Sequence, residues 1–179
     1  MRRLLLIAGL LSVSGVVPAS TLRQLSLDDM IRQSTVIVRG TVAPANTMYH
    51  GSLIFTHYLV QVTETYKGAV SGPTEIGVPG GVLKGAIQRF AGAPAFAAGQ
   101  DYVLFLWTSK TGLTQVIGLS QGLFSIISTS GGPVTVVRAA ATERMLNAAG
   151  EPVNDNDIQM SLSDLKTHIQ TVLAGPTAQ

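Results

Sequence analysis

The 179-residue chain contains no cysteine. This excludes disulfides, thiolate catalysis and every Cys-based metal site. Charged residues are scarce too, at 12% of the chain, whereas hydrophobic residues make up 46%. A disordered chain would need more charge and fewer aliphatic side chains. The composition therefore predicts a single globular domain with a core of its own.

The first nineteen residues have the three-part pattern of a secretory signal peptide. Arg2 and Arg3 precede an uncharged run from Leu4 to Val17, and Val17-Pro18-Ala19 ends in a small residue suited to cleavage. An uncleaved anchor is the alternative, but the apolar run is shorter than the roughly 20 residues that span a bilayer. We therefore expect residues 1–19 to be removed and residues 20–179 to be exported, to the periplasm or outside the cell, with no membrane span.

Loss of the two N-terminal arginines also changes the charge balance. The full chain has 12 Lys and Arg against 10 Asp and Glu, a net charge of +2, whereas the chain from Ser20 carries ten of each. Nucleic-acid binding needs a basic groove, and the remaining basic residues are scattered. We therefore expect no nucleic-acid partner.

Helical patterns lie at the two ends of the mature chain. Ser26 can cap a short amphipathic helix that runs to about Gln33. Ser161 and Asp164 have capping-box spacing at the start of a second helix. The apolar stripe of this second helix consists of Leu162, Leu165, Ile169, Val172 and Leu173.

Strand patterns fill the middle of the chain. The continuous apolar run Tyr102–Trp107 is typical of a strand covered on both faces. Because no helices alternate with the strands, the pattern argues against a βαβ fold and favours a barrel or a sandwich. We predict a mainly β, OB-like β-barrel with a short N-terminal helix and a C-terminal amphipathic helix, in which Asn154–Asp157 is a polar linker. The predicted strands are 36–42, 55–66, 75–78, 102–107, 115–118, 123–127 and 134–137.

Several phrases of the chain together resemble a group of uncharacterised exported bacterial proteins, similar in outline to the netrin-like or tissue-inhibitor-of-metalloproteinase-like OB barrel. This resemblance implies the fold more than the function. In the metalloproteinase inhibitors an N-terminal cysteine contacts the protease zinc, whereas the predicted terminus here is Ser20-Thr21-Leu22. A protease inhibitor of this descent would therefore need an altered contact. The matching phrases are 25–42 (LSLDDMIRQSTVIVRGTV), 65–68 (TYKG), 79–81 (PGG), 96–106 (FAAGQDYVLFL), 118–124 (GLSQGLF) and 161–170 (SLSDLKTHIQ).

The segment from Gly118 to Gly122 matches G-x-S-x-G with Ser120 as the nucleophile, and His168 follows three acids, Asp155, Asp157 and Asp164. In α/β-hydrolases this motif lies on a strand-to-helix turn. Here the next residues, 123–127, form a strand pattern, which indicates a glycine-bounded hairpin. We therefore expect no enzyme, and a small serine hydrolase using Ser120 is the unfavoured alternative.

Metal and cofactor sites are not expected either. The histidines His50, His57 and His168 are the only ligands besides carboxylates, and zinc needs three or four. His50 and His57 would lie on opposite faces of a continuous strand, an argument that weakens if His50 lies in a turn. The stretch 80–85 contains three glycines and a lysine but lacks the Gly-Lys-Ser/Thr ending of a phosphate-binding loop.

The segment Pro79–Gly99 is the candidate interaction loop. It is long for a plain connection, contains five glycines and suggests a small hairpin around Gly85. Its apolar residues (Val82, Leu83, Ile87, Phe90 and Phe96) need cover, so a loop that only closes the barrel mouth is the alternative. The leading hypothesis is a non-enzymatic binding module that contacts an exported protein, a protease included. The candidate contact residues are Pro79, Gly80, Gly81, Lys84, Gly85, Arg89 and Pro94.

Overall fold

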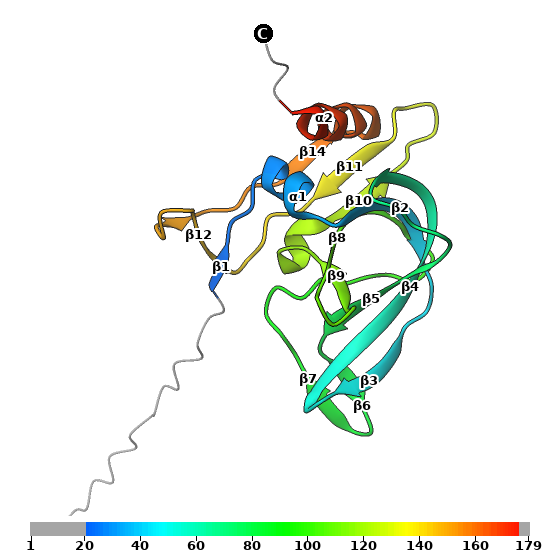
Figure 1. The fold of residues 1–179 in the computed structure, drawn as a ribbon, viewed down its shortest axis with the longest axis vertical. Helices are drawn as coiled ribbons and strands as arrows, with labels where there is room; N and C mark the ends of the chain where they lie inside the picture. Colours follow the sequence, from blue (N-terminus) through cyan, green and yellow to red (C-terminus); the bar gives the residue numbers. More distant parts are fainter. Residues whose placement is uncertain (1–20, 176–179) are drawn as a thin grey trace, which may run out of the picture.

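The computed structural model describes residues 21–175 (Figure 1). The predicted signal peptide, residues 1–19, lies outside the described residues. The helices are α1 (Leu27–Gln33), the 3-10 helix η1 (Leu119–Gly122) and α2 (Leu162–Ala174). The strands are β1 (Thr21–Arg23), β2 (Val36–Val42), β3 (Asn46–His50), β4 (Leu53–Lys67), β5 (Thr74–Pro79), β6 (Gly81–Leu83), β7 (Ala86–Gln88), β8 (Asp101–Thr108), β9 (Thr114–Val116), β10 (Leu123–Ile127), β11 (Thr135–Arg138), β12 (Arg144–Leu146), β13 (Pro152–Val153) and β14 (Ile158–Ser161).

The main sheet has nine antiparallel strands in the order β14-β11-β10-β8-β2-β4-β3, with β5 beside β4 and β9 beside β8. The 15-residue β4 pairs through its C-terminal half with β2, and through its N-terminal half with β3 and β5. Strands β5 and β9 also come close to each other. The hydrogen-bonded pairings of the described residues do not close the sheet. The mainly β class is therefore confirmed, whereas a closed barrel is not found.

Two hydrophobic clusters form the core, and β8 separates them. Val103 and Phe105 of β8 are fully buried in one cluster together with residues of both helices. Leu104 and Leu106, which point to the other face, are fully buried in the second cluster. The prediction that this strand is covered on both faces is confirmed. Each such side chain contributes about 1.5–3 kcal/mol to stability.

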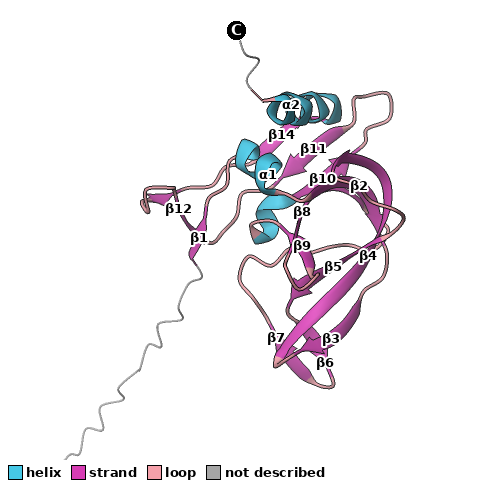
Figure 2. Ribbon diagram, in the orientation of Figure 1, coloured by secondary structure: helices cyan, strands magenta, loops and turns pink. Residues whose placement is uncertain are grey.

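Both helices begin as the sequence predicts. The Ser26 side chain accepts a hydrogen bond from the Asp29 backbone N–H (3.0 Å), and Asp29 accepts one in return from the Ser26 N–H (3.3 Å). The Ser161 side chain likewise accepts from the Asp164 N–H (3.0 Å). Helices α1 and α2 lie next to each other at one end of the molecule (Figure 2).

A small second sheet projects from the main sheet as an arm (Figure 1). In this arm β1 pairs parallel with β12, and β12 pairs antiparallel with β13. The arm returns to the main sheet through residues 154–157, which belong to no strand or helix and are mostly exposed, so the predicted polar linker is confirmed. This linker is anchored at two points, because the Asp155 side chain, only 4% exposed, pairs with Arg138, and Asp157 accepts a hydrogen bond from the Ala140 N–H (2.7 Å).

Candidate functional site

The structure divides the candidate loop 79–99 into three parts. The first is the β6–β7 hairpin, in which Lys84 and Gly85 form a two-residue turn, both with positive φ (50° and 81°). This turn geometry is the one that fits the twist of a hairpin, and Gly85 adopts it without steric cost. The predicted hairpin around Gly85 is therefore confirmed.

The last part of the loop covers the core. The Phe96 ring packs between Tyr58 and Tyr102, at centroid distances of 4.9 and 5.5 Å. The Ala97 N–H also donates a hydrogen bond to the Tyr102 hydroxyl (3.0 Å). Pro94 is buried, so it offers no exposed contact surface. This part of the loop acts as the cover that its apolar residues predict.

Between these parts, the loop borders a surface groove of about 430 Å³. Pro79, Arg89 and Phe90 of the loop face Leu22 of β1 and Leu119 of η1 across it. Phe90 remains 38% exposed. Among residues 21–175, no salt bridge involves Arg89. The groove therefore offers an exposed aromatic ring and a cation with no carboxylate partner.

Of the seven candidate contact residues, the structure brings only Pro79 and Arg89 into this groove. Gly81, Lys84 and Gly85 belong to the hairpin. Gly80 is buried where the chain leaves β5, and its N–H donates to the Ile54 carbonyl (2.8 Å). The candidate contact residues that are not buried therefore lie on two surfaces, the β6–β7 hairpin and the groove.

Gln121 connects two walls of the groove, and sequence reasoning missed this role. Its side chain is 1% exposed, accepts a hydrogen bond from the Leu25 N–H (2.8 Å) and donates to the carbonyl oxygens of Arg23 (3.0 Å) and Gly118 (3.2 Å). The chain that follows β1 is thereby fixed to η1. A single glutamine between glycines carries no periodic signal that would have revealed this role.

Leu119 forms the groove wall in a strained backbone conformation. Its φ of +59° lies in the left-handed region, which costs a residue with a Cβ about 1–2 kcal/mol. Gly92 lies directly against its side chain, and the Ser120 N–H donates to the Gly92 carbonyl (3.0 Å). These contacts hold the 89–93 segment beside η1 and give the groove a defined shape.

The residues of the G-x-S-x-G hypothesis lie in separate environments. Ser120 is in η1, between β9 and β10. The strand after Gly122 is confirmed, but the predicted hairpin is wrong, because β9 and β10 each pair with β8 and not with each other. His168 pairs through Nε2 with Asp28 (2.7 Å), and Asp155 pairs with Arg138. Within residues 21–175, no hydrogen bond joins Ser120 to His168.

The two central histidines lie on the same face of the sheet, unlike the expectation for a continuous strand. A turn at Gly51 folds β3 back onto β4, so the His50 and His57 rings flank Phe55 at 5.7 and 6.4 Å. His57 is only 8% exposed, and its Nδ1 lies 2.8 Å from Oε1 of Glu75. The described residues contain no cluster of three or more potential metal ligands.

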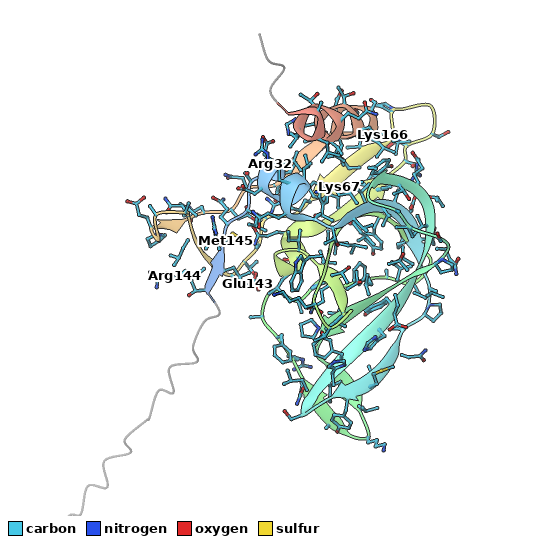
Figure 3. The ribbon with its side chains drawn as sticks, in the orientation of Figure 1. Arg32, Lys67, Glu143, Arg144, Met145 and Lys166 are labelled. Carbon is cyan, nitrogen blue, oxygen red and sulfur yellow. The ribbon has the colours of Figure 1, made fainter. Side chains whose placement is uncertain are left out.

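Two other basic residues, Lys67 and Lys166, have structural partners (Figure 3). Lys67 donates to the carbonyl oxygens of Ile31 (2.7 Å) and Arg32 (2.8 Å) at the C-terminal end of α1, and burial lowers the pKa of its amine. Lys166 pairs with Glu64, and its amine lies 5.4 Å from the centre of the Tyr66 ring. These contacts join the helices to β4, so neither lysine is a free cation for a ligand.

Searches of the chain against models of known protein families, against curated proteins and against solved structures found no match. Within residues 21–175, the helices are too short or too polar to cross a bilayer.

Proposed function

We propose that the chain is an exported, non-enzymatic binding module that contacts another exported protein through the groove beside Phe90. The observation that carries this proposal is that a groove of defined shape is bordered by two neighbouring residues, the exposed Phe90 ring and the Arg89 cation, which has no carboxylate partner among the described residues. Aromatic residues and arginine are enriched among the residues that dominate the energy of protein interfaces. A partner segment with an apolar side chain next to an acidic one complements this groove.

The strand arrangement supports an OB-like, incompletely closed barrel as the scaffold. Strand β2 lies between β4 and β8, β5 extends one side and β9 the other, and β5 and β9 come close without a hydrogen-bonded ladder. OB-like scaffolds use loops around the barrel for binding, which is an argument from analogy. The loop 79–99 joins β5 to β8 at this scaffold.

A protease inhibitor with an altered contact is the second candidate. Cleavage after Ala19 would leave one residue before β1, whose Leu22 borders the groove. The new chain terminus and the loop would then meet the same partner. This placement favours an inhibitor that presents its terminus, although no cysteine is available to bind a protease metal.

The test is capture of partners by the immobilised chain from Ser20, crosslinked to the exported proteins of its host and read by mass spectrometry. The retained protein should be lost with Arg89→Glu and with Phe90→Ser, but kept with Lys110→Glu, a charge reversal at an exposed site outside the groove. If the retained protein is a protease, stoichiometric inhibition should accompany its capture. Equal capture by both groove variants, or no retained protein at all, would contradict the proposal.

A further inference from the structure

Exposed apolar side chains gather at the end of the molecule opposite α2. The β3–β4 turn and the β6–β7 hairpin lie together there (Figure 1). We call residues 46–54 and 81–88 the distal wedge. Half of the ten large hydrophobic side chains that are exposed in the described residues belong to it. They are Met48, Tyr49, Leu53, Val82 and Ile87.

The two hairpins of the distal wedge are fixed to each other. The Thr47 hydroxyl donates to the Val82 carbonyl (3.0 Å), and Gln88 accepts from the Ile54 N–H (2.7 Å). Gly81 permits this contact, because a Cβ at its position would lie 2.9 Å from the Thr47 methyl carbon. The wedge therefore consists of two layers, the β3–β4 turn and the β6–β7 hairpin, whose inner faces contact each other.

Four of these exposed apolar residues lie on the two outer faces of this unit, whereas Tyr49 pairs with Ile54 and lies on the face of β3 that is turned toward the β6–β7 hairpin. Val82 and Ile87 are cross-strand partners, each 60% exposed, and they point away because their neighbour Gln88 faces β4. On the other layer, Ile54 is buried toward the β6–β7 hairpin, so Leu53 points to the opposite side. Met48, which alternates in the same way with Thr47, shares the face of Leu53.

The charge of the distal wedge has one sign. Lys84, at the tip of the β6–β7 hairpin, is its only charged residue, and no acidic residue occurs in either segment. Lys84 makes no salt bridge within the described part of the chain. A basic tip with apolar sides complements a surface that is negatively charged outside and apolar beneath.

We propose that the distal wedge inserts into the headgroup region of an anionic lipid bilayer. A flat protein surface can cover only one outer face of the wedge, whereas lipid surrounds the tip and covers both at once. Lys84 would contact lipid phosphates and, because burial of its charge in hydrocarbon is costly, would restrict insertion to the interface. Tyr49 is 49% exposed and has the amphipathic side chain that favours this depth.

The test is flotation of the chain from Ser20 with lipid vesicles. This chain holds every residue of the described fold and lacks the apolar run Leu4–Val17, which would bind lipid by itself. Vesicles of phosphatidylethanolamine with phosphatidylglycerol should bind it roughly fivefold more tightly than vesicles of phosphatidylcholine, and Lys84→Glu should abolish this preference.

Each outer face is then tested separately. Val82→Ser/Ile87→Ser should lower the partition coefficient about tenfold, and Met48→Ser/Leu53→Ser should do the same, since each removes two apolar side chains from lipid. Ile127→Ser, at a side chain 51% exposed on β10, is the matched control and should bind as the unchanged chain does. Thermal unfolding of every variant verifies that the fold is retained, which the exposure of these side chains favours.

A spectroscopic readout locates the tip directly. Trp107 is the single tryptophan, so Trp107→Phe combined with Ile87→Trp places the only indole on the wedge. Anionic vesicles should shift its emission to the blue. No flotation, no blue shift, or loss of binding from one outer face alone would overturn the proposal, the last result indicating a flat protein surface instead. Partner capture depends on Arg89 and Phe90, whereas flotation depends on Lys84 and the two outer faces, so failure here is distinguishable from failure of the groove proposal.

Discussion

Arg138 and Asp155 form a doubly hydrogen-bonded ion pair in which each side chain is only 4% exposed. Nη1 of Arg138 lies 2.6 Å from Oδ2 of Asp155, and Nη2 lies 2.9 Å from Oδ1. Nη2 also donates to the Asn156 carbonyl (2.6 Å), and Oδ2 accepts from the Ala141 N–H (2.9 Å). The pair therefore fixes both ends of the β12–β13 arm to the end of β11.

Replacement of Arg138 by Met should destabilise the protein strongly. The change leaves the Asp155 carboxylate buried without its partner, which typically costs about 3–5 kcal/mol. Urea unfolding followed by circular dichroism measures the loss. The double change Arg138→Met/Asp155→Leu should recover much of it, because an apolar pair has no charge to desolvate.

The matched control is Arg32→Met, which breaks the exposed ion pair with Asp28 on α1. Exposed pairs contribute about 0–1 kcal/mol, so this variant should unfold nearly as the unchanged chain does. If Arg32→Met and Arg138→Met lowered the free energy of unfolding equally, burial would not determine how much an ion pair contributes here.

Stability should fall at acid pH, partly through Asp155. Burial alone would raise the pKa of Asp155, but hydrogen bonds from Arg138 and Ala141 outweigh it and hold the pKa below its ordinary value of 3.8. A carboxyl whose pKa is lowered by folding stabilises the protein above its unfolded pKa, and this contribution is lost as the pH falls through the folded pKa.

Urea midpoints measured across the acid range test this pH dependence. Asp155→Asn should be less stable at neutral pH and should lose less further stability on acidification. Some acid dependence should remain, because the Ser26 hydrogen bond lowers the pKa of Asp29 and the Lys166 contact lowers that of Glu64. If the urea midpoint of Asp155→Asn fell with pH as steeply as that of the unchanged chain, Asp155 would not contribute to the acid dependence.

Replacement of Gln121 by Met should loosen the groove. The change keeps the length of the side chain but leaves the Leu25 N–H without its acceptor, at a cost of about 1–3 kcal/mol. Hydrogen exchange at the Leu25 amide should accelerate more than exchange in the β8 core. Gln100→Met, at an exposed glutamine, is the control and should change neither the stability of the protein nor the rate of hydrogen exchange at the Leu25 amide. Unchanged protection at Leu25 would mean that Gln121 does not fix β1.

Local signals in the sequence were sufficient for the helices and for β8. Ser26 and Ser161 each have an acidic residue three positions later, which is the capping pattern of a helix start. The continuous apolar run of β8 indicates a strand that is covered on both faces of the sheet. Strands β1, β12 and β13 were not predicted, because two or three residues are too few to show alternation. The linker 154–157 was predicted, but its anchoring was not, because the partner of Asp155, Arg138, lies 17 residues earlier.

The sequence singled out the loop that forms one wall of the candidate groove, but only two of its seven candidate contact residues, Pro79 and Arg89, border that groove. Glycine spacing revealed the hairpin, and the length of the loop marked it as more than a connection. Alternation indicates that Val82 and Ile87 share a face but not whether that face is covered, and both are exposed rather than packed as expected. The groove itself depends on Leu22 and Leu119, which only the tertiary structure brings to the loop.

Gly40 should tolerate no side chain, because β4 leaves no room for a Cβ at this position. A Cβ at Gly40 would lie 2.5 Å from the Gln61 carbonyl oxygen and 2.7 Å from a Val60 methyl carbon, at a shift in the strand register. Since a backbone oxygen cannot move aside as a flexible side chain does, Gly40→Ala should cost about 1–3 kcal/mol through overpacking. Gly132→Ala is the control, because its nearest atoms lie 3.6 Å away, and urea unfolding should show little change for it. Equal stability of the two variants would mean that the strands separate at Gly40 without cost, which contradicts the close contact between β2 and β4 at this position.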